Sequence, residues 1–148
     1  FLWGSKPLPM IDFRSYFGQD SPQPATQEEE AMISQMNVTV NNVSFTATLE
    51  NNQAAQALVD MMRNGPLTLA MQDYAGFEKV GPLASLPASD VQTTTQSGDI
   101  VLYNGNQIVI FYGSNSWSYT RLGHIDDLTG WADALGSGDV SVTFSLAE

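Results

Sequence analysis

Apolar and polar residues alternate along most of the chain after Met36, and this period of two predicts β-strands. The stretch NVTVNNVSFTATL (residues 37–49) reads as a hairpin, because Asn41-Asn42 tolerates the positive φ of a two-residue turn. The strongest hairpin signal is GDIVLYNGNQIVIFYG (98–113), in which two apolar runs flank NGN. LTLAMQ (67–72), SWSYTRLG (116–123) and DVSVTFSL (139–146) predict further strands.

Two segments have helical spacing instead. In QAAQALVDMMRN (53–64) one face carries Ala54, Ala55, Leu58, Met61 and Met62, which is typical of a helix that packs on a core. Asn51 or Asn52 is the expected N-cap, and Gly65-Pro66 ends the helix. IDDLTGWADAL (125–135) reads as a short helix with Gly136 beyond its end.

Strands therefore outnumber helices, and the pattern predicts a mainly β domain, an antiparallel barrel or sandwich with two short helices at its ends. Residues 73–97 are rich in Gly, Pro, Ser and Thr and read as one long segment between strands. Segments of that length are uncommon and are usually functional or contain short elements.

Residues 1–35 form an N-terminal extension in this reading, and residues 36–148 form the domain. The extension opens with aromatic residues that follow no clear period (1–17) and continues with a proline- and glutamate-rich stretch that predicts a linker. We expect the segment 1–17 to dock on the domain, to contact a partner, or to belong to a preceding domain.

Charge and composition argue against several classes of binding partner and of chemistry. The 148 residues carry a net charge of −11 with only five Lys and Arg, which argues against binding nucleic acid or an anionic membrane. The absence of cysteine excludes disulfides and thiolate chemistry. No apolar run reaches about 18 residues, so we expect no transmembrane segment. One histidine and no calcium-binding loop predict no metal site, and we expect no cofactor.

Several blocks of sequence, in order, resemble bacterial cyclophilin-like proteins. They are FTATLENNQAAQAL, GPLTL, EKVG, GDIVLYNGNQIVIFYG, YTRLG and ALGSGDVSVTF. The resemblance covers roughly Met36 to Leu146 and implies a closed antiparallel β-barrel of the eight-stranded type, capped by helices. Members are often exported or lipid-anchored through a polar linker, which implies an extracytoplasmic location for this chain. The fold by itself assigns no activity.

Cyclophilins are prolyl isomerases, so the resemblance makes prolyl isomerisation a hypothesis for this chain. Their signature places an arginine and a phenylalanine shortly before a Gln-Gly-Gly-Asp stretch. The nearest match here is QSGD (96–99), and the segment before it, ASDVQTTT, has neither an arginine nor an aromatic residue. The signature is therefore not reproduced, and we predict no catalytic residues.

Aromatic residues in the long segment and the central strands suggest a binding surface. The candidate ligand-binding residues are Tyr74, Phe77, Glu78, Tyr103, Tyr119 and Arg121. Arg121 has two readings, a salt bridge to a nearby acid or an anchor for a carboxylate or peptide carbonyl at the mouth of the barrel.

The only histidine, His124, stands in SYTRLGHIDDLTGW (118–131) beside several charged residues. We interpret this cluster as a loop entering the second helix, with Asp126 and Asp127 as capping carboxylates, rather than as a catalytic site.

The sequence thus predicts a non-catalytic module that binds a small molecule or a short peptide segment. Two alternatives stay open: a divergent prolyl isomerase, and an interaction domain of an extracytoplasmic assembly with residues 1–17 as its contact segment.

Overall fold

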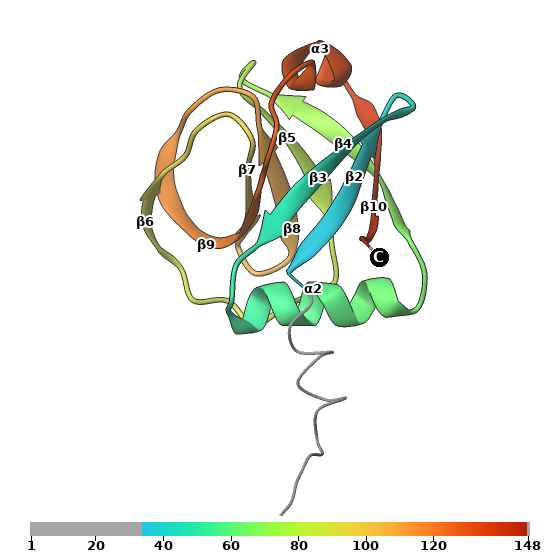
Figure 1. The fold of residues 1–148 in the computed structure, drawn as a ribbon. Coiled ribbons are helices and arrows are strands. Elements are labelled where there is room, and N and C mark those ends of the chain that lie inside the picture. Colours follow the sequence, from blue (N-terminus) through green and yellow to red (C-terminus); the bar gives the residue numbers. More distant parts are fainter. Residues whose placement is uncertain (1–33, 148) are drawn as a thin grey trace, which may run out of the picture. The chain divides into compact units, whose positions relative to one another are not determined.

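The computed structural model describes residues 34–147 (Figure 1). These residues form one antiparallel sheet and two helices, α2 (Gln53–Arg63) and α3 (Trp131–Leu135). The predictions for residues 1–33 lie outside the described part. The strands are β2 (Gln35–Val40), β3 (Val43–Leu49), β4 (Leu67–Tyr74), β5 (Glu78–Pro82), β6 (Val91–Thr94), β7 (Asp99–Tyr103), β8 (Gln107–Phe111), β9 (Ser116–Ile125) and β10 (Val140–Leu146).

The sheet closes on itself. Its order is β3-β2-β10-β4-β5-β8-β7-β9-β6, and β3 also pairs with β9, which joins eight strands into a barrel. The ninth strand, β6, lies outside the ring and pairs with the first half of β9. The predicted mainly β class and closed antiparallel barrel are confirmed.

Closure depends on a close approach between β3 and β9. A Cβ atom on Gly123 would lie 2.5 Å from the carbonyl oxygen of Thr48, a distance that real Cβ contacts do not reach. Only glycine allows the two backbones to come this near. The glycine in YTRLG is therefore a requirement of the closed barrel.

Apolar side chains fill the barrel interior. Strand alternation points Met36, Val38 and Val40 of β2 inward, and all three are fully buried, as are Ile108 and Ile110 of β8. Figure 1 shows α2 across one end of the barrel and α3 at the other, as the sequence suggested.

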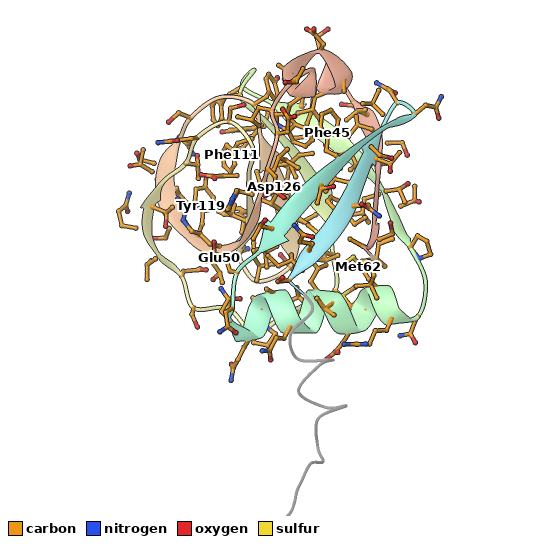
Figure 2. All side chains as sticks on the ribbon, viewed as in Figure 1. Phe45, Glu50, Met62, Phe111, Tyr119 and Asp126 are labelled. Atoms are coloured by element: carbon orange, nitrogen blue, oxygen red, sulfur yellow. The ribbon has the colours of Figure 1, made fainter. Side chains whose placement is uncertain are left out.

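Helix α2 follows its prediction closely. Asn52 is the N-cap, and its Oδ1 accepts a hydrogen bond from the Ala55 amide at 2.8 Å. The buried face consists of Ala54, Ala55, Leu58, Val59 and Met62. Met62 lies against the end of the barrel (Figure 2), whereas Met61, predicted on the same face, is half-buried.

Helix α3 is shorter than predicted, and the expected carboxylate caps are wrong. It begins at Trp131 after Gly130, whose φ of 78° is left-handed and which makes no side-chain cap. Asp127 instead accepts the Thr129 amide at 3.0 Å within a turn, and this bond lowers the pKa of Asp127. The helix is held by its tryptophan, whose Nε1 donates to the Phe111 carbonyl at 2.8 Å.

The segment 73–97 is not one long loop. Strand β4 runs on to Tyr74, and β5 pairs with it through Gln72, Asp73 and Tyr74. The two strands are joined by a turn in which Ala75 and Gly76 have φ of 57° and 76°. The segment also contains β6, so its longest irregular stretch is residues 83–90, between β5 and β6, and a second short one follows β6 at residues 95–97.

Candidate functional site

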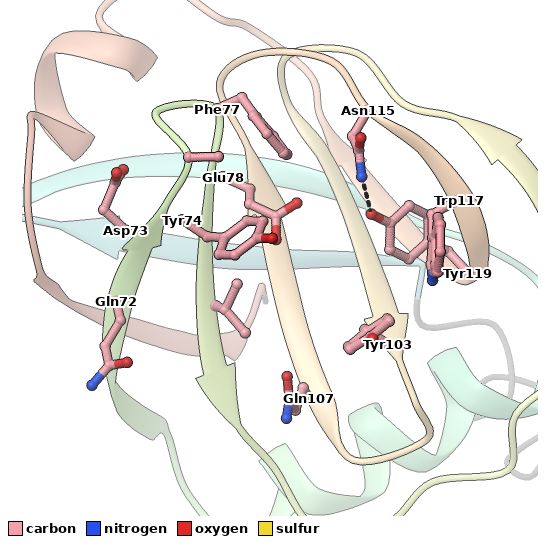
Figure 3. Close-up of a pocket in the computed structure, with 12 residues that line it drawn as sticks. Gln72, Asp73, Tyr74, Phe77, Glu78, Tyr103, Gln107, Asn115, Trp117 and Tyr119 are labelled. Carbon is pink, nitrogen blue, oxygen red and sulfur yellow. Dashed lines mark hydrogen bonds between the residues drawn. The ribbon is translucent and has the colours of Figure 1, made fainter.

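A pocket of about 650 Å³ lies on the outer face of the barrel wall, over strands β4, β5, β8 and β7 (Figure 3). The first half of β9 forms its far side. Its lining consists of Gln72, Asp73, Tyr74, Ala75, Phe77, Glu78, Val80, Tyr103, Gln107, Asn115, Trp117 and Tyr119. The hollow therefore lies outside the barrel, and not at its mouth.

Strand register explains which side chains face the pocket. Glu78 stands opposite Tyr74 on one side and Phe111 on the other, so these three share the outer face. Its neighbour Lys79 stands opposite Asp73 and Ile110 and points to the inner face. Successive residues of β5 thus belong to two different environments.

A second apolar cluster lies on the outer side of the barrel wall, and the lining residues Phe77, Val80 and Tyr103 pack against it. Val101, Val109, Phe111 and Tyr119 are buried there. The Tyr119 ring packs edge to face on Phe111 with 5.7 Å between ring centroids. Figure 3 shows Phe77 and Trp117 on opposite sides of the opening.

Two exposed aromatic residues stand at the rim. Tyr74 is 60% exposed and Trp117 is 56% exposed. Tyr74 packs edge to face on Phe77 at 5.9 Å between centroids. Exposed aromatic side chains above a buried apolar cluster are typical of a surface that contacts another molecule.

Glu78 is the unusual group of the pocket. It is 7% exposed, and its Oε1 atom is buried without a hydrogen-bond partner among residues 34–147. Loss of water raises the pKa of this carboxyl to about 7, with a further contribution from the charge of Asp73. The group therefore changes charge near neutral pH.

Asp73, the other carboxylate of the lining, is fully engaged. Its Oδ1 accepts from Lys79 Nζ at 3.1 Å and also from the Tyr112 hydroxyl, and its Oδ2 accepts from the Gly76 amide at 3.2 Å. These bonds lower the pKa of Asp73, those of Tyr112 and Lys79 most. Asp73 thus stays ionised with its oxygens occupied.

Lys79 is held on the inner side of the same wall. It is fully buried, and its Nζ also donates to the carbonyls of Gly136 at 2.9 Å and Gly138 at 2.6 Å, after α3. A buried ammonium with an acid and two carbonyls as partners is fully satisfied. Lys79 is therefore not a cation that the pocket could offer to a ligand.

The chain belongs to the cyclophilin-like family. A sequence model of that family matches residues 38–145, which is most of the described part. A hypothetical protein from Archaeoglobus fulgidus, known from a solution structure, is similar in fold to this cyclophilin-like chain. Its TM-score is 0.52 at 15% identity, covering 77% of this chain and 95% of that one. A comparison with curated proteins finds no match.

Five of the six candidate residues of this cyclophilin-like domain line the pocket together, and Arg121 does not. The Arg121 guanidinium pairs with Asp99 at 3.2 Å between Nη1 and Oδ2, and donates to the Thr94 carbonyl at 3.5 Å. Of the two interpretations of Arg121, a salt bridge or an anchor for a ligand, the structure therefore shows the salt bridge.

His124 lies within β9 and not in a loop that enters α3. Its register partners are Thr48 and Asp99, and its ring is half exposed. Its Nε2 lies 3.8 Å from Asp126 Oδ1, and that oxygen accepts a hydrogen bond from Thr48 Oγ1 at 2.6 Å. His124, Thr48 and Asp126 thus lie together where β3 meets the end of β9, and all three are outside the pocket lining.

Sequence reasoning missed Trp117 and Asn115. The alternation in SWSY puts Trp117 on the same face as Tyr119, and this signal could have identified it. Asn115 Nδ2 donates to the Tyr119 hydroxyl at 2.8 Å, a contact that depends on how the chain enters β9. Gln72 and Gln107 carry no local signal, because only strand pairing brings them to the pocket.

Residues 34–147 contain neither a cluster of metal-ligating side chains nor a helix that could span a membrane. Between Ser34 and Ala147, no group of three or more His, Asp or Glu side chains is placed to hold a metal ion. No helix in that range has the length and apolar character needed to cross a membrane.

Proposed function

We propose that this cyclophilin-like domain is a binding module that holds a small organic molecule or a short peptide segment in the outer pocket, without catalysis. The observation that carries the proposal is a buried, unpartnered carboxyl in a pocket with an aromatic wall. Its volume falls in the range of about 300–1,000 Å³ that is typical of small-ligand sites.

The lining favours binding over prolyl isomerisation. Cyclophilin isomerases use an arginine that contacts the peptide carbonyl region, as the family resemblance implies. Among the described residues that line the pocket there is no arginine, lysine or histidine. Arg121 lies on another part of β9 and pairs with Asp99 of β7, so it supports no such role.

The test is chemical-shift mapping on the isotope-labelled chain with a fragment library and a set of short X-Pro peptides. We expect the ligands that bind to shift the amides of Tyr103, Asn115 and Trp117. Removing either rim aromatic, by Tyr74→Ala or Trp117→Ala, should weaken binding about tenfold or more, because such residues dominate interface energies.

Val91→Ala is the matched control. Val91 is an exposed apolar residue of β6 outside the lining, and its removal should leave the affinity unchanged. Shifts that fall elsewhere on the barrel, or unchanged affinity in both aromatic variants, would refute the pocket as the binding site. Faster isomerisation of the X-Pro peptides than the uncatalysed tens of seconds would favour the isomerase alternative.

A further inference from the structure

Glu78 is the carboxylate of the pocket whose charge is not offset by a basic side chain, whereas Asp73 is paired with Lys79. The lining of the pocket contains two carboxylates and no basic side chain within the described part of the chain. Asp73 is already bound by Lys79, Tyr112 and Gly76. Glu78 Oε1 is thus left as the one acceptor that a ligand would need to satisfy in this lining.

The other groups around Glu78 present π-faces and hydroxyls. Figure 3 shows its carboxyl pointing into the pocket beside the Tyr74 ring, with Phe77 above and Tyr119 across the opening. Aromatic faces attract cations through their quadrupole, and this attraction grows when water is excluded. An anionic ligand would meet the Glu78 carboxylate with no basic partner beside it.

We propose that the pocket recognises an organic ammonium ion with an N–H group, a protonated primary or secondary amine on an apolar body. The ammonium donates to Glu78 Oε1, and the apolar body lies against Tyr74, Phe77 and Trp117. This inference rests on the proposed binding function and names its ligand class.

The need for an N–H group follows from the unsatisfied oxygen. A buried acceptor without a donor costs about 1–3 kcal/mol, and more when it is charged. An ammonium N–H removes this cost and neutralises the carboxylate, whereas a quaternary ammonium supplies charge without a donor. The net charge of −11 further favours the approach of cations to the chain.

Binding of such a ligand should depend on the proton of Glu78. The titratable and charged groups that face it are Asp73 and Tyr74 of β4, Tyr103 of β7 and Tyr119 of β9. Burial raises the pKa of Tyr119, so that hydroxyl stays neutral, and Asp73 keeps its negative charge. The pKa of Glu78 is about 7, so ammonium binding should strengthen about tenfold from pH 6 to pH 8.

Three probes of one shape separate charge from apolar contact. They are 2-phenylethylamine, which is an ammonium ion at pH 8, the neutral 2-phenylethanol, and the anion 3-phenylpropionate. Calorimetric titration of the full chain at pH 8 should give an affinity for the amine at least about tenfold above that for the alcohol, as a buried ion pair predicts. The anion should not bind.

Glu78→Gln is the informative variant, since it keeps the shape and removes the charge. It should bring the amine and the alcohol to similar affinity and abolish the pH dependence. Glu50→Gln is its control, because Glu50 precedes α2 and lies outside the lining (Figure 2). This control removes the same charge from the chain and should retain the preference for the amine.

The outcomes separate the two proposals. Equal affinity for amine and alcohol in the unmodified chain would overturn ammonium recognition and leave the pocket as a binding site. Absence of amine binding, with library ligands still bound at Tyr103 and Trp117, would do the same. Failure of every ligand at the pocket would overturn both. The pH series on the unmodified chain tests the charge of Glu78 without any substitution.

Discussion

Burial of the Glu78 carboxyl makes the stability of the barrel depend on pH. The pKa of Glu78 is about 7 in the folded chain, against an ordinary value of 4.5. Between these values the folded state keeps a proton that the unfolded state has lost, so the free energy of unfolding falls as pH rises. We expect a decrease of roughly 2–3 kcal/mol from about pH 4.5, complete above about pH 7.

Urea unfolding at several pH values between about 5 and 8 measures this effect. Glu78→Gln should remove the decrease and be more stable than the unmodified chain at pH 8, while Glu50→Gln should keep it. The lowered pKa values of Asp73 and Asp127 act in the opposite direction, but below their ordinary 3.8, outside this range. A slope that survives Glu78→Gln would contradict the assignment.

Individual residues were predictable from sequence where their chemistry is local. Asn52 as a helix cap and Asn41-Asn42 as a turn follow from the residue types themselves. The ion-pair partner of Arg121 could not be predicted in this way, because Asp99 comes beside Arg121 only when β7 pairs with β9. The isolation of Glu78 Oε1 is likewise a property of packing, and no spacing in the sequence encodes it.

At the scale of the element, the β4–β5 hairpin supplies many of the residues that line the pocket. The sequence did not predict this hairpin, because the residues of its turn are not typical of one. Its two central residues, Ala75 and Gly76, both have positive φ, as a type I′ turn requires. Asparagine and glycine mark such turns, and the NN and NGN hairpins were found by them. Alanine gives no such signal, so the segment read as a loop.

The same turn offers a stabilising substitution. Alanine at a φ of 57° carries a steric cost that asparagine largely avoids, so Ala75→Asn should raise the free energy of unfolding by about 1 kcal/mol. The measurement is the urea midpoint at unchanged slope. Ala84→Asn, at an exposed alanine whose φ is not positive, should give no gain. No gain for Ala75→Asn would show that the turn tolerates alanine without strain.

For the whole molecule, the order of strands could not be read from alternation alone. The period of two identified most strands, and the family resemblance supplied the closed barrel. The position of the pocket depends on β9, which pairs with β3 and β7 through its second half and with β6 through its first. That division places Trp117 and Tyr119 over the outer wall. The extracytoplasmic location of the chain stays a prediction.

The closed barrel predicts that residues 34–148 fold on their own. Every strand of the ring lies between Gln35 and Leu146, and the ring closes through the β3–β9 pairing around Gly123. A closed sheet leaves no edge of the ring that needs another segment for its hydrogen bonds. We therefore expect the shortened chain to unfold in one cooperative transition, with a Tm within a few degrees of that of the full chain.

Circular dichroism against temperature checks this expectation, and calorimetry with 2-phenylethylamine checks that the pocket is intact. Gly123→Ala in the shortened chain is the matched negative control, since a methyl group there would collide with the Thr48 carbonyl. It should lower the free energy of unfolding by about 1–3 kcal/mol. Loss of the cooperative transition in the shortened chain itself would mean that residues 1–33 supply part of the fold. A retained fold with an altered oligomeric state would assign those residues to assembly.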